Sequence, residues 1–266
     1  MQRTWHWVAC FLLFPLLISC DDSSKTSLGA DVAIYVDAVC WEESVIAAVN
    51  MFRWMGCSIE SVGADLINNG DLGNFRVLCV PGGDMYRYSQ DISSEGKENI
   101  RNFIRDGGGY IGICGGAYFA SEIVRWRGTL LNMTPLGLFP GSAEGPNDAI
   151  VPYPEYAMCK INIIDVTHPI TQSMGDSMWI LYYWGPELVV EEGADVSILG
   201  VYDSSIHAAM VALEYGEGRV FLSGTHPEIE EDSDRDSVQF GDELDDQGSD
   251  WELMRKVVQW CLGGEI

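Results

Sequence analysis

Basic residues are scarce in this 266-residue chain: 15 Lys and Arg stand against 40 Asp and Glu, and the formal net charge is −25. Proteins bind nucleic acids and other polyanions through clustered Lys and Arg side chains. The strongest charge cluster here is acidic instead, and it runs from Glu228 to Asp250. We therefore expect no nucleic-acid partner, whereas cations, neutral molecules and basic partners remain open.

A long hydrophobic run is also missing. The apolar segment from Trp5 to Ile18 has about 14 residues, short of the ~20 that a transmembrane helix needs. Arg3 precedes this segment and a small-residue ending follows it, as in a secretory signal peptide. An apolar membrane anchor left uncleaved is the weaker alternative.

The ending of this segment, Leu17-Ile18-Ser19-Cys20, resembles the lipobox of bacterial lipoproteins, in which the cysteine becomes the lipidated N-terminus. By this resemblance residues 1–19 are a signal peptide, Cys20 carries the lipid, and residues 20–30 are a polar tether. We expect a protein of the cell envelope, anchored to the membrane and facing the periplasm or the exterior.

The cysteines lack the spacing of a disulfide framework, although an exported chain permits disulfides. Cys10 would leave with the signal peptide and Cys20 would carry lipid. Cys79 lies within an apolar strand pattern and is expected to be a small buried side chain. Besides Cys79, the folded part contains Cys40, Cys57, Cys114, Cys159 and Cys261.

Short apolar β-rich segments alternate with amphipathic ones in the first half of the chain, which predicts a parallel sheet buried on both faces. Predicted strands cover 31–36, 58–62, 75–80 and 110–113, with helices over 42–55 and 98–105. With no internal repeat, residues 31–266 are interpreted as one α/β domain.

The second half predicts more strands and two long loops. The strands are expected at 160–166, 178–183 and 196–202, and a hairpin joins 210–214 to 219–223. Loops are expected at 137–154, which is rich in Gly and Pro, and at 230–250, before a final helix over 251–262.

The most informative segment runs from Gly109 to Ala120, where an apolar strand leads into Cys114, two glycines and a helix. This is the pattern of a nucleophile elbow with Cys in place of Ser. The glycines allow the close chain approach that a sharp strand-to-helix turn requires, and the helix N-terminus favours the reactive thiolate. The alternative is an ordinary buried thiol at a strand end.

His226 and Glu228 lie two residues apart at the end of a predicted strand, where residues i and i+2 point to one side. Pro227 biases His226 towards extended backbone. The Glu228 carboxylate is then placed to orient the imidazole as a general base for Cys114. A histidine that only caps a strand end is the simpler alternative.

Pro81-Gly82-Gly83 ends an earlier strand and is either a plain turn or part of an oxyanion hole. In the second case the backbone N–H groups of Gly82, Gly83 and Gly115 are the candidate donors. Such donors often lower a reaction barrier by ~3–4 kcal/mol.

These three motifs, in this order, resemble class I glutamine amidotransferase-like proteins, and more closely the amidotransferase-like N-terminal domain of some biotin-protein ligases. The shared segments are Pro81-Gly82-Gly83, Gly112 to Tyr118, and Gly224-Thr225-His226-Pro227-Glu228. The resemblance implies a flavodoxin-like three-layer sandwich with a mostly parallel sheet, with Cys114 as nucleophile, His226 as base and Glu228 as orienter. Glutaminases of this class carry His-Gln or Phe-Gln after the elbow, where this chain has Ala117-Tyr118-Phe119-Ala120, so the resemblance does not single out glutamine.

The acidic segment 230–250 contains a weak metal signal. Asp232, Asp234, Asp236 and Glu243 occupy places of an EF-hand calcium loop, but Ser237 stands where glycine is needed. We expect no metal or cofactor, and interpret the segment either as a solvated acidic loop or as a mobile lid that leaves the site directly after Glu228.

Two further signals concern His168 and a run of aromatic residues. His168-Pro169 is typical of a cap or turn more than of a site. Trp179, Tyr182, Tyr183 and Trp184 are interpreted as core residues, with stacking on a ligand ring as the alternative.

Three functions fit these patterns. The first is a thiol hydrolase or amidase that attacks an amide or related acyl group of a small molecule or peptide through Cys114. The second is a ligand-binding module that kept the fold and lost the reaction. The third is a redox-sensing thiol protein, which needs only the thiolate. The oligomeric state is not predicted.

Overall fold

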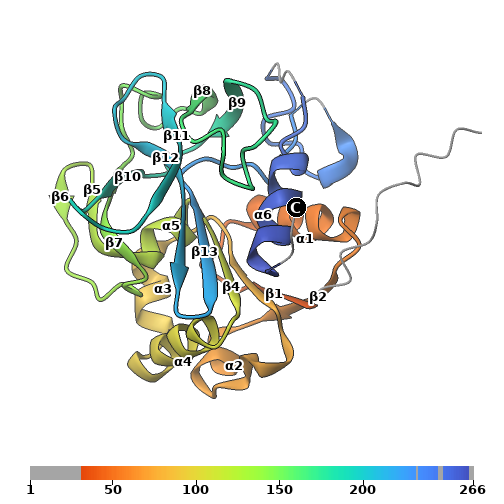
Figure 1. The fold of residues 1–266 in the computed structure, drawn as a ribbon, viewed down its shortest axis with the longest axis vertical. Helices are drawn as coiled ribbons and strands as arrows, with labels where there is room; N and C mark the ends of the chain where they lie inside the picture. Colours follow the sequence, from red (N-terminus) through yellow and green to blue (C-terminus); the bar gives the residue numbers. More distant parts are fainter. Residues whose placement is uncertain (1–30, 232, 245–247, 264–266) are drawn as a thin grey trace, which may run out of the picture.

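A large mixed β-sheet runs through the molecule, and helices cover both faces of its parallel part (Figure 1). The structure, a computed structural model, describes residues 31–231, 233–244 and 248–263. The predicted signal peptide and Cys20 lie outside the described residues. Within the described residues, no helix is both long and apolar enough to cross a membrane.

The parallel part has the strand order β2-β1-β3-β4-β13. Its strands are β1 (Asp31–Tyr35), β2 (Ser58–Val62), β3 (Val77–Val80), β4 (Gly109–Ile113) and β13 (Gly218–Ser223). The predicted α/β fold with a largely parallel central sheet is therefore confirmed.

The inner strands β3 and β4 are apolar along their whole length because both of their faces are buried. In β3, Val77 and Cys79 belong to one core, and Leu78 and Val80 to the core on the opposite face. This alternation produces the continuous apolar runs from which the sequence predicts a parallel sheet. Cys79 is fully buried, as predicted.

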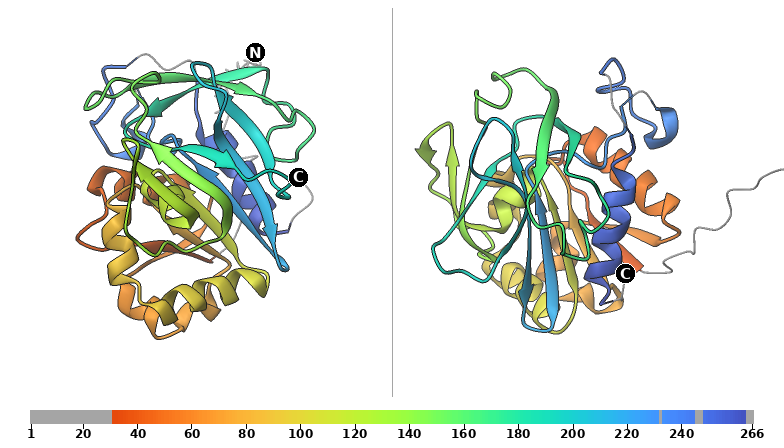
Figure 2. Two further views of the ribbon diagram at one scale, coloured as in Figure 1. Left: turned by 90° about the vertical axis from the view of Figure 1, so that its left-hand side faces the viewer. Right: turned by 45° about the horizontal axis from the view of Figure 1, so that its top comes forward.

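Helices form the outer layers. The first core packs α1 (Glu42–Trp54) and α6 (Trp251–Cys261) against the sheet, and the ring centroids of Trp54 and Trp251 lie 5.6 Å apart. Figure 2 shows these two helices together on one side of the strands. The opposite face is covered by α2 (Ala64–Asn68), α3 (Met85–Asp91), α4 (Ser94–Arg105) and α5 (Gly115–Ala120).

Beyond β13 the sheet continues mainly through antiparallel pairs. The predicted hairpin is confirmed, because β12 (Ala208–Tyr215) pairs antiparallel with β13. The remaining strands are β5 (Ser121–Trp126), β6 (Thr129–Leu130), β7 (Phe139–Gly145), β8 (Ala157–Ile163), β9 (Ser177–Tyr182), β10 (Glu187–Val190) and β11 (Ser197–Tyr202).

Two predicted boundaries in this region are wrong. The loop expected over 137–154 contains β7, which pairs with β10 and β5 despite its Gly and Pro. The strand expected at 160–166 runs from Ala157 to Ile163, because the Asp165 carboxylate accepts the N–H groups of Thr167 and His168 and so forms a turn.

The acidic segment is more buried than a solvated loop. Glu230, Glu231, Asp236 and Asp250 are each at most 4% exposed, so the solvated interpretation is wrong for these four residues. Both oxygens of Asp236 accept backbone N–H groups, from Glu230 and Val238. The segment also contacts α1, because the Asn50 side-chain amide donates to the Asp236 carbonyl at 2.7 Å.

Candidate functional site

Cys114 occupies the predicted turn between β4 and α5. Its φ of 48° and ψ of −102° lie outside the common regions for a non-glycine residue, as expected of a strained nucleophile elbow. Its N–H donates to the Ser223 carbonyl at 2.8 Å, which ties the elbow to the end of β13. A Cβ on Gly115 would lie 2.4 Å from the Gly83 carbonyl oxygen, so only glycine fits beside this turn.

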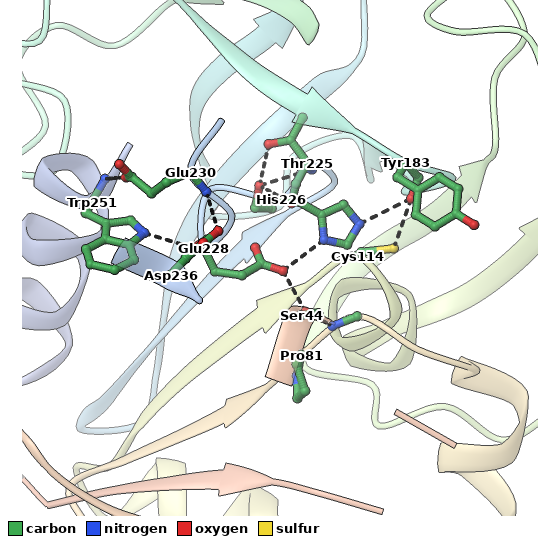
Figure 3. A network of polar contacts seen from close by, with 12 residues as sticks. Ser44, Pro81, Cys114, Tyr183, Thr225, His226, Glu228, Glu230, Asp236 and Trp251 are labelled. Atoms are coloured by element: carbon green, nitrogen blue, oxygen red, sulfur yellow. Dashed lines mark hydrogen bonds and ion pairs between the residues drawn. The ribbon is translucent and has the colours of Figure 1, made fainter. Parts of the chain in front are cut away.

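The parallel pairing of β4 and β13 brings Cys114, His226 and Glu228 to one edge of the sheet (Figure 3). His226 and Glu228 are fully buried, and the imidazole Nδ1 lies 2.9 Å from Glu228 Oε1. Cys114 is 8% exposed, and its Sγ and His226 Nε2 both lie next to the Tyr183 carbonyl oxygen. The predicted i, i+2 arrangement of histidine and glutamate is thus present in the structure.

The surroundings of His226 suit an imidazolium. Nδ1 faces the Glu228 carboxylate and Nε2 faces the Tyr183 carbonyl oxygen at 3.2 Å, so both ring nitrogens have an acceptor in front of them. Burial alone lowers the pKa of His226, but the charges of Glu228 and Cys114 and its hydrogen bonds to both raise it to about 10. His226 is therefore a proton donor at neutral pH.

The Tyr183 carbonyl is shared between the two reactive groups. Cys114 Sγ lies 3.6 Å from this oxygen, which also accepts from His226 Nε2 (Figure 3). Tyr183 directly follows β9, and its residue type predicts a role for the side chain alone. A backbone acceptor of this kind leaves no trace in residue type.

Ser44 is a site residue that the sequence analysis missed. Its hydroxyl donates to Glu228 Oε1 at 2.6 Å and accepts the Gly82 N–H at 2.9 Å, and the side chain is fully buried. Ser44 lies in the first turn of α1, which follows β1 at the same edge of the sheet. The position of Ser44 just after a predicted strand could have indicated a site residue, because the carboxyl ends of parallel strands share one edge of the sheet.

Of the three expected oxyanion donors, Gly82 is wrongly predicted. Its N–H is already donated to Ser44 Oγ, and a Cβ at this position would lie 2.9 Å from His226 Cε1. Gly82 thus permits close packing against the imidazole. The N–H groups of Gly83 and Gly115 donate to no other group in the described part of the chain, and a Cβ built on Gly115 would lie 2.7 Å from Gly83 N.

A cavity of about 480 Å³ opens beside Cys114 and His226. Its wall contains Gly83, Asp84, Met85 and Leu131 and six aromatic residues, namely Trp41, Tyr86, Tyr118, Trp126, Tyr183 and Trp184. Of the aromatic residues expected in the core, Tyr182 is fully buried and Trp179 is 40% exposed, whereas Tyr183 and Trp184 line this cavity. Tyr183 and Trp184 are therefore not core residues, and their position at the cavity wall is the one that stacking on a ligand ring would require.

The weaker sequence signals lie outside this cavity. His168 forms a turn, as expected: its Nδ1 accepts the N–H of Ile170, and its ring lies 5.3 Å from that of Trp260. Asp232 lies outside the described residues, and Asp236 uses both carboxylate oxygens on backbone N–H groups. Among the residues that the structure describes, no group of three or more His, Cys, Asp or Glu side chains is arranged to hold a metal ion.

Solved structures with the same fold include a ThuA-like protein from Bacteroides uniformis and a glutamine amidotransferase from Thermotoga maritima. The first has a TM-score of 0.56 at 12% identity over 91% of this chain and 98% of that one. The second has a TM-score of 0.55 at 10% identity over 88% of this chain and 98% of that one. At these identities the likeness concerns the fold alone.

Two curated relatives match part of the chain. The biotin–protein ligase of Schizosaccharomyces pombe is 27% identical over 165 residues, which cover 58% of this chain and 25% of that protein. An uncharacterized protein of Chlamydia muridarum is 30% identical over 161 residues, which cover 58% of this chain and 60% of that protein. The chain thus spans less than two thirds of the length of either relative.

A family model described as biotin-protein ligase, N terminal, matches residues 30–258. This match includes the elbow, the His226–Glu228 pair and the aromatic cavity. The chain therefore belongs to the biotin-protein ligase N-terminal family, with a glutamine amidotransferase-like fold.

Proposed function

We propose that the protein is a cysteine-dependent hydrolase or amidase, with Cys114 as nucleophile, His226 as acid and base, and Glu228 as the group that orients His226. The observation that carries this proposal is the buried Glu228–His226 pair, which shares the Tyr183 carbonyl with the strained Cys114 at the wall of an open cavity. A thiol, a base and an orienting carboxylate in this order are the parts that nucleophilic catalysis requires.

The reaction begins with attack of the Cys114 thiolate on the substrate carbonyl, so that a C–S bond forms and the carbonyl oxygen becomes an oxyanion. The N–H groups of Gly83 and Gly115 are placed to donate to this oxygen. The C–N bond then breaks, and the His226 imidazolium gives its Nε2 proton to the departing amine.

Hydrolysis of the thioester completes the cycle. Water attacks the acyl carbon, His226 accepts the water proton, the C–S bond breaks, and the carboxylic acid leaves. Ser44 acts here as a positioning residue, because one hydroxyl links the orienting carboxylate to the backbone next to Gly83.

The test uses p-nitrophenyl acetate as an unspecific acyl donor and follows p-nitrophenolate release together with intact-protein mass. We expect a burst of one equivalent, an acetyl adduct on Cys114, and turnover of that adduct. Cys114→Ala should abolish the burst, and His226→Gln should slow loss of the acetyl group by about 100-fold, a typical size for a general base.

Other outcomes would favour the other two functions. Rapid alkylation of Cys114 with no acyl adduct would favour a redox thiol. An unreactive Cys114 in a protein that still binds small molecules in the cavity would favour a binding module.

The lipid anchor is a separate part of the proposal and rests on the sequence around Cys20. We infer that the mature chain begins at Cys20 and is held at the membrane in the cell envelope. With a net charge of −25, the folded part is unsuited to binding anionic lipid or nucleic acid by charge.

A further inference from the structure

The wall of the cavity is built from aromatic side chains that come from separate parts of the chain. Trp41 precedes α1, Tyr118 lies on α5, Trp126 ends β5, and Tyr183 and Trp184 follow β9. They form a connected series: the ring centroids of Trp41 and Tyr183 are 5.1 Å apart, and those of Tyr183 and Trp184 are 4.5 Å apart. The series continues from Trp184 to Trp126 at 6.5 Å and from Trp126 to Tyr118 at 5.9 Å.

Hydrogen bonds fix the middle of this wall. Trp184 has a φ of 62°, and its indole Nε1 donates to the Pro154 carbonyl at 3.0 Å. Its own carbonyl accepts the Tyr118 hydroxyl at 3.2 Å. A wall held in this way can stack on a flat ligand without first paying the entropy of ordering its side chains.

The cavity offers little to a negative charge. Among the residues that the structure describes, no Lys or Arg lines the cavity, and its charged members are Asp84, at the exposed start of α3, and His226. The ring nitrogens of His226 already face Glu228 and Tyr183. The Arg127 guanidinium lies 4.5 Å from the Tyr153 ring centroid, outside the lining set. Away from the Cys114 end, a carboxylate in the cavity would lose water and would meet no Lys or Arg among the described lining residues.

The Cys114 thiol and the neighbouring N–H groups of Gly83 and Gly115 meet at one end of the cavity. A reacting carbonyl must lie there, so the rest of the ligand lies along the aromatic wall. The volume of about 480 Å³ falls in the range of cavities that hold a ring-bearing small molecule.

We propose that the site acts on amides that carry an uncharged, flat aromatic group next to the reacting carbonyl, rather than on the carboxylate-bearing amide of a free amino acid. This inference rests on the proposed function, because it names the substrate class of the Cys114 site.

The test measures alkylation of Cys114 by four matched chloroacetamides with N-benzyl, N-methyl, N-carboxymethyl or N-(2-trimethylammonioethyl) substituents. Sγ displaces chloride in each case, with formation of the C–S bond and release of the chloride ion. Site-resolved mass spectrometry gives the rates, and each rate is divided by that of the same probe with glutathione. We expect the N-benzyl probe to exceed the N-methyl probe by about tenfold, as ring stacking and apolar burial allow, and the N-carboxymethyl probe to be the slowest.

Variants locate the preference. Trp126→Leu should reduce the N-benzyl to N-methyl ratio several-fold, whereas Trp179→Leu, a matched change on β9 outside the cavity, should leave the ratio as it is. A separate titration of N-benzylacetamide and N-acetylglycine into Cys114→Ala tests binding without reaction, and only the first should bind.

The outcomes separate the two proposals. A Cys114 that reacts no faster than glutathione with every probe would contradict the proposed function, and the titration would still test the cavity. A reactive Cys114 with equal N-benzyl and N-methyl rates, or a faster N-carboxymethyl or cationic probe, would overturn the aromatic-amide inference and leave the hydrolase proposal standing.

Discussion

Replacement of Glu228 by Gln tests whether a buried carboxylate keeps His226 protonated. The change keeps the size of the side chain and removes its charge at the atom that lies 2.9 Å from His226 Nδ1. The pKa of His226 is raised to about 10 in the native protein by charges that outweigh the cost of burial. In Glu228→Gln the burial cost remains while one of those charges is lost, so the pKa of His226 should fall.

The size of the fall follows from the bond that is weakened. Hydrogen bonds to charged groups contribute about 1.5–3 kcal/mol, and one pKa unit corresponds to about 1.4 kcal/mol. We therefore expect the pKa of His226 to fall by about 1–2 units. Nuclear magnetic resonance of the imidazole ¹⁵N nuclei across pH measures this directly.

His168 provides an internal control. Burial lowers the pKa of His168 below the ordinary value, despite the nearby Asp165 carboxylate. The pKa of His168 is therefore shifted in the opposite direction from that of His226. Its titration should be the same in the native protein and in Glu228→Gln. A native His226 that titrates at or below pH 6.5, or one that is unmoved by the substitution, would refute the reasoning.

The same shift affects stability. The folded-state pKa of His226 lies above the unfolded value of about 6.5, so its contribution to stability is complete below pH 6.5 and is lost as the pH rises towards 10. Denaturant unfolding across this interval should show a larger loss of stability in the native protein than in Glu228→Gln.

Four further predictions concern reactivity, packing and location. Cys114 should be alkylated by iodoacetamide at least tenfold faster than Cys79, whose burial raises its pKa well above the ordinary value; equal rates in site-resolved mass spectrometry would remove the proposed nucleophile. Ser44→Ala should lower the free energy of unfolding by about 1–3 kcal/mol, because the Gly82 N–H loses its buried acceptor; an unchanged urea midpoint would show that this bond contributes nothing. Gly82→Ala should reduce acyl-enzyme formation by displacing the imidazole, since its Cβ would lie 2.9 Å from His226 Cε1, and an unaltered p-nitrophenyl acetate burst would argue against this contact. Cys20→Ala should abolish globomycin-sensitive processing and membrane association in cell fractionation, and a mature protein that stays in the membrane fraction after this change would exclude the anchor.

The parallel core and the order of the site motifs could be predicted from short stretches of sequence. The runs at 32–35 and 77–80 are apolar throughout because both faces of those strands are buried, and this pattern is local. The pattern of strand, cysteine and glycines around Cys114 is also local, and so is the pair His226 and Glu228, which lie two residues apart. In these cases the physical cause acts within a few residues of chain.

Contacts between segments far apart in the chain could not be predicted from the sequence. Ser44 meets Glu228 across 184 positions, and the Tyr183 carbonyl meets Cys114 across 69. The use of Gly82 for packing instead of oxyanion binding follows from that same Ser44 hydroxyl. The burial of Asp236 and the aromatic wall of the cavity likewise arise only when separate elements pack together, because hydrogen-bond partners and cavity walls are properties of that packing and not of residue type.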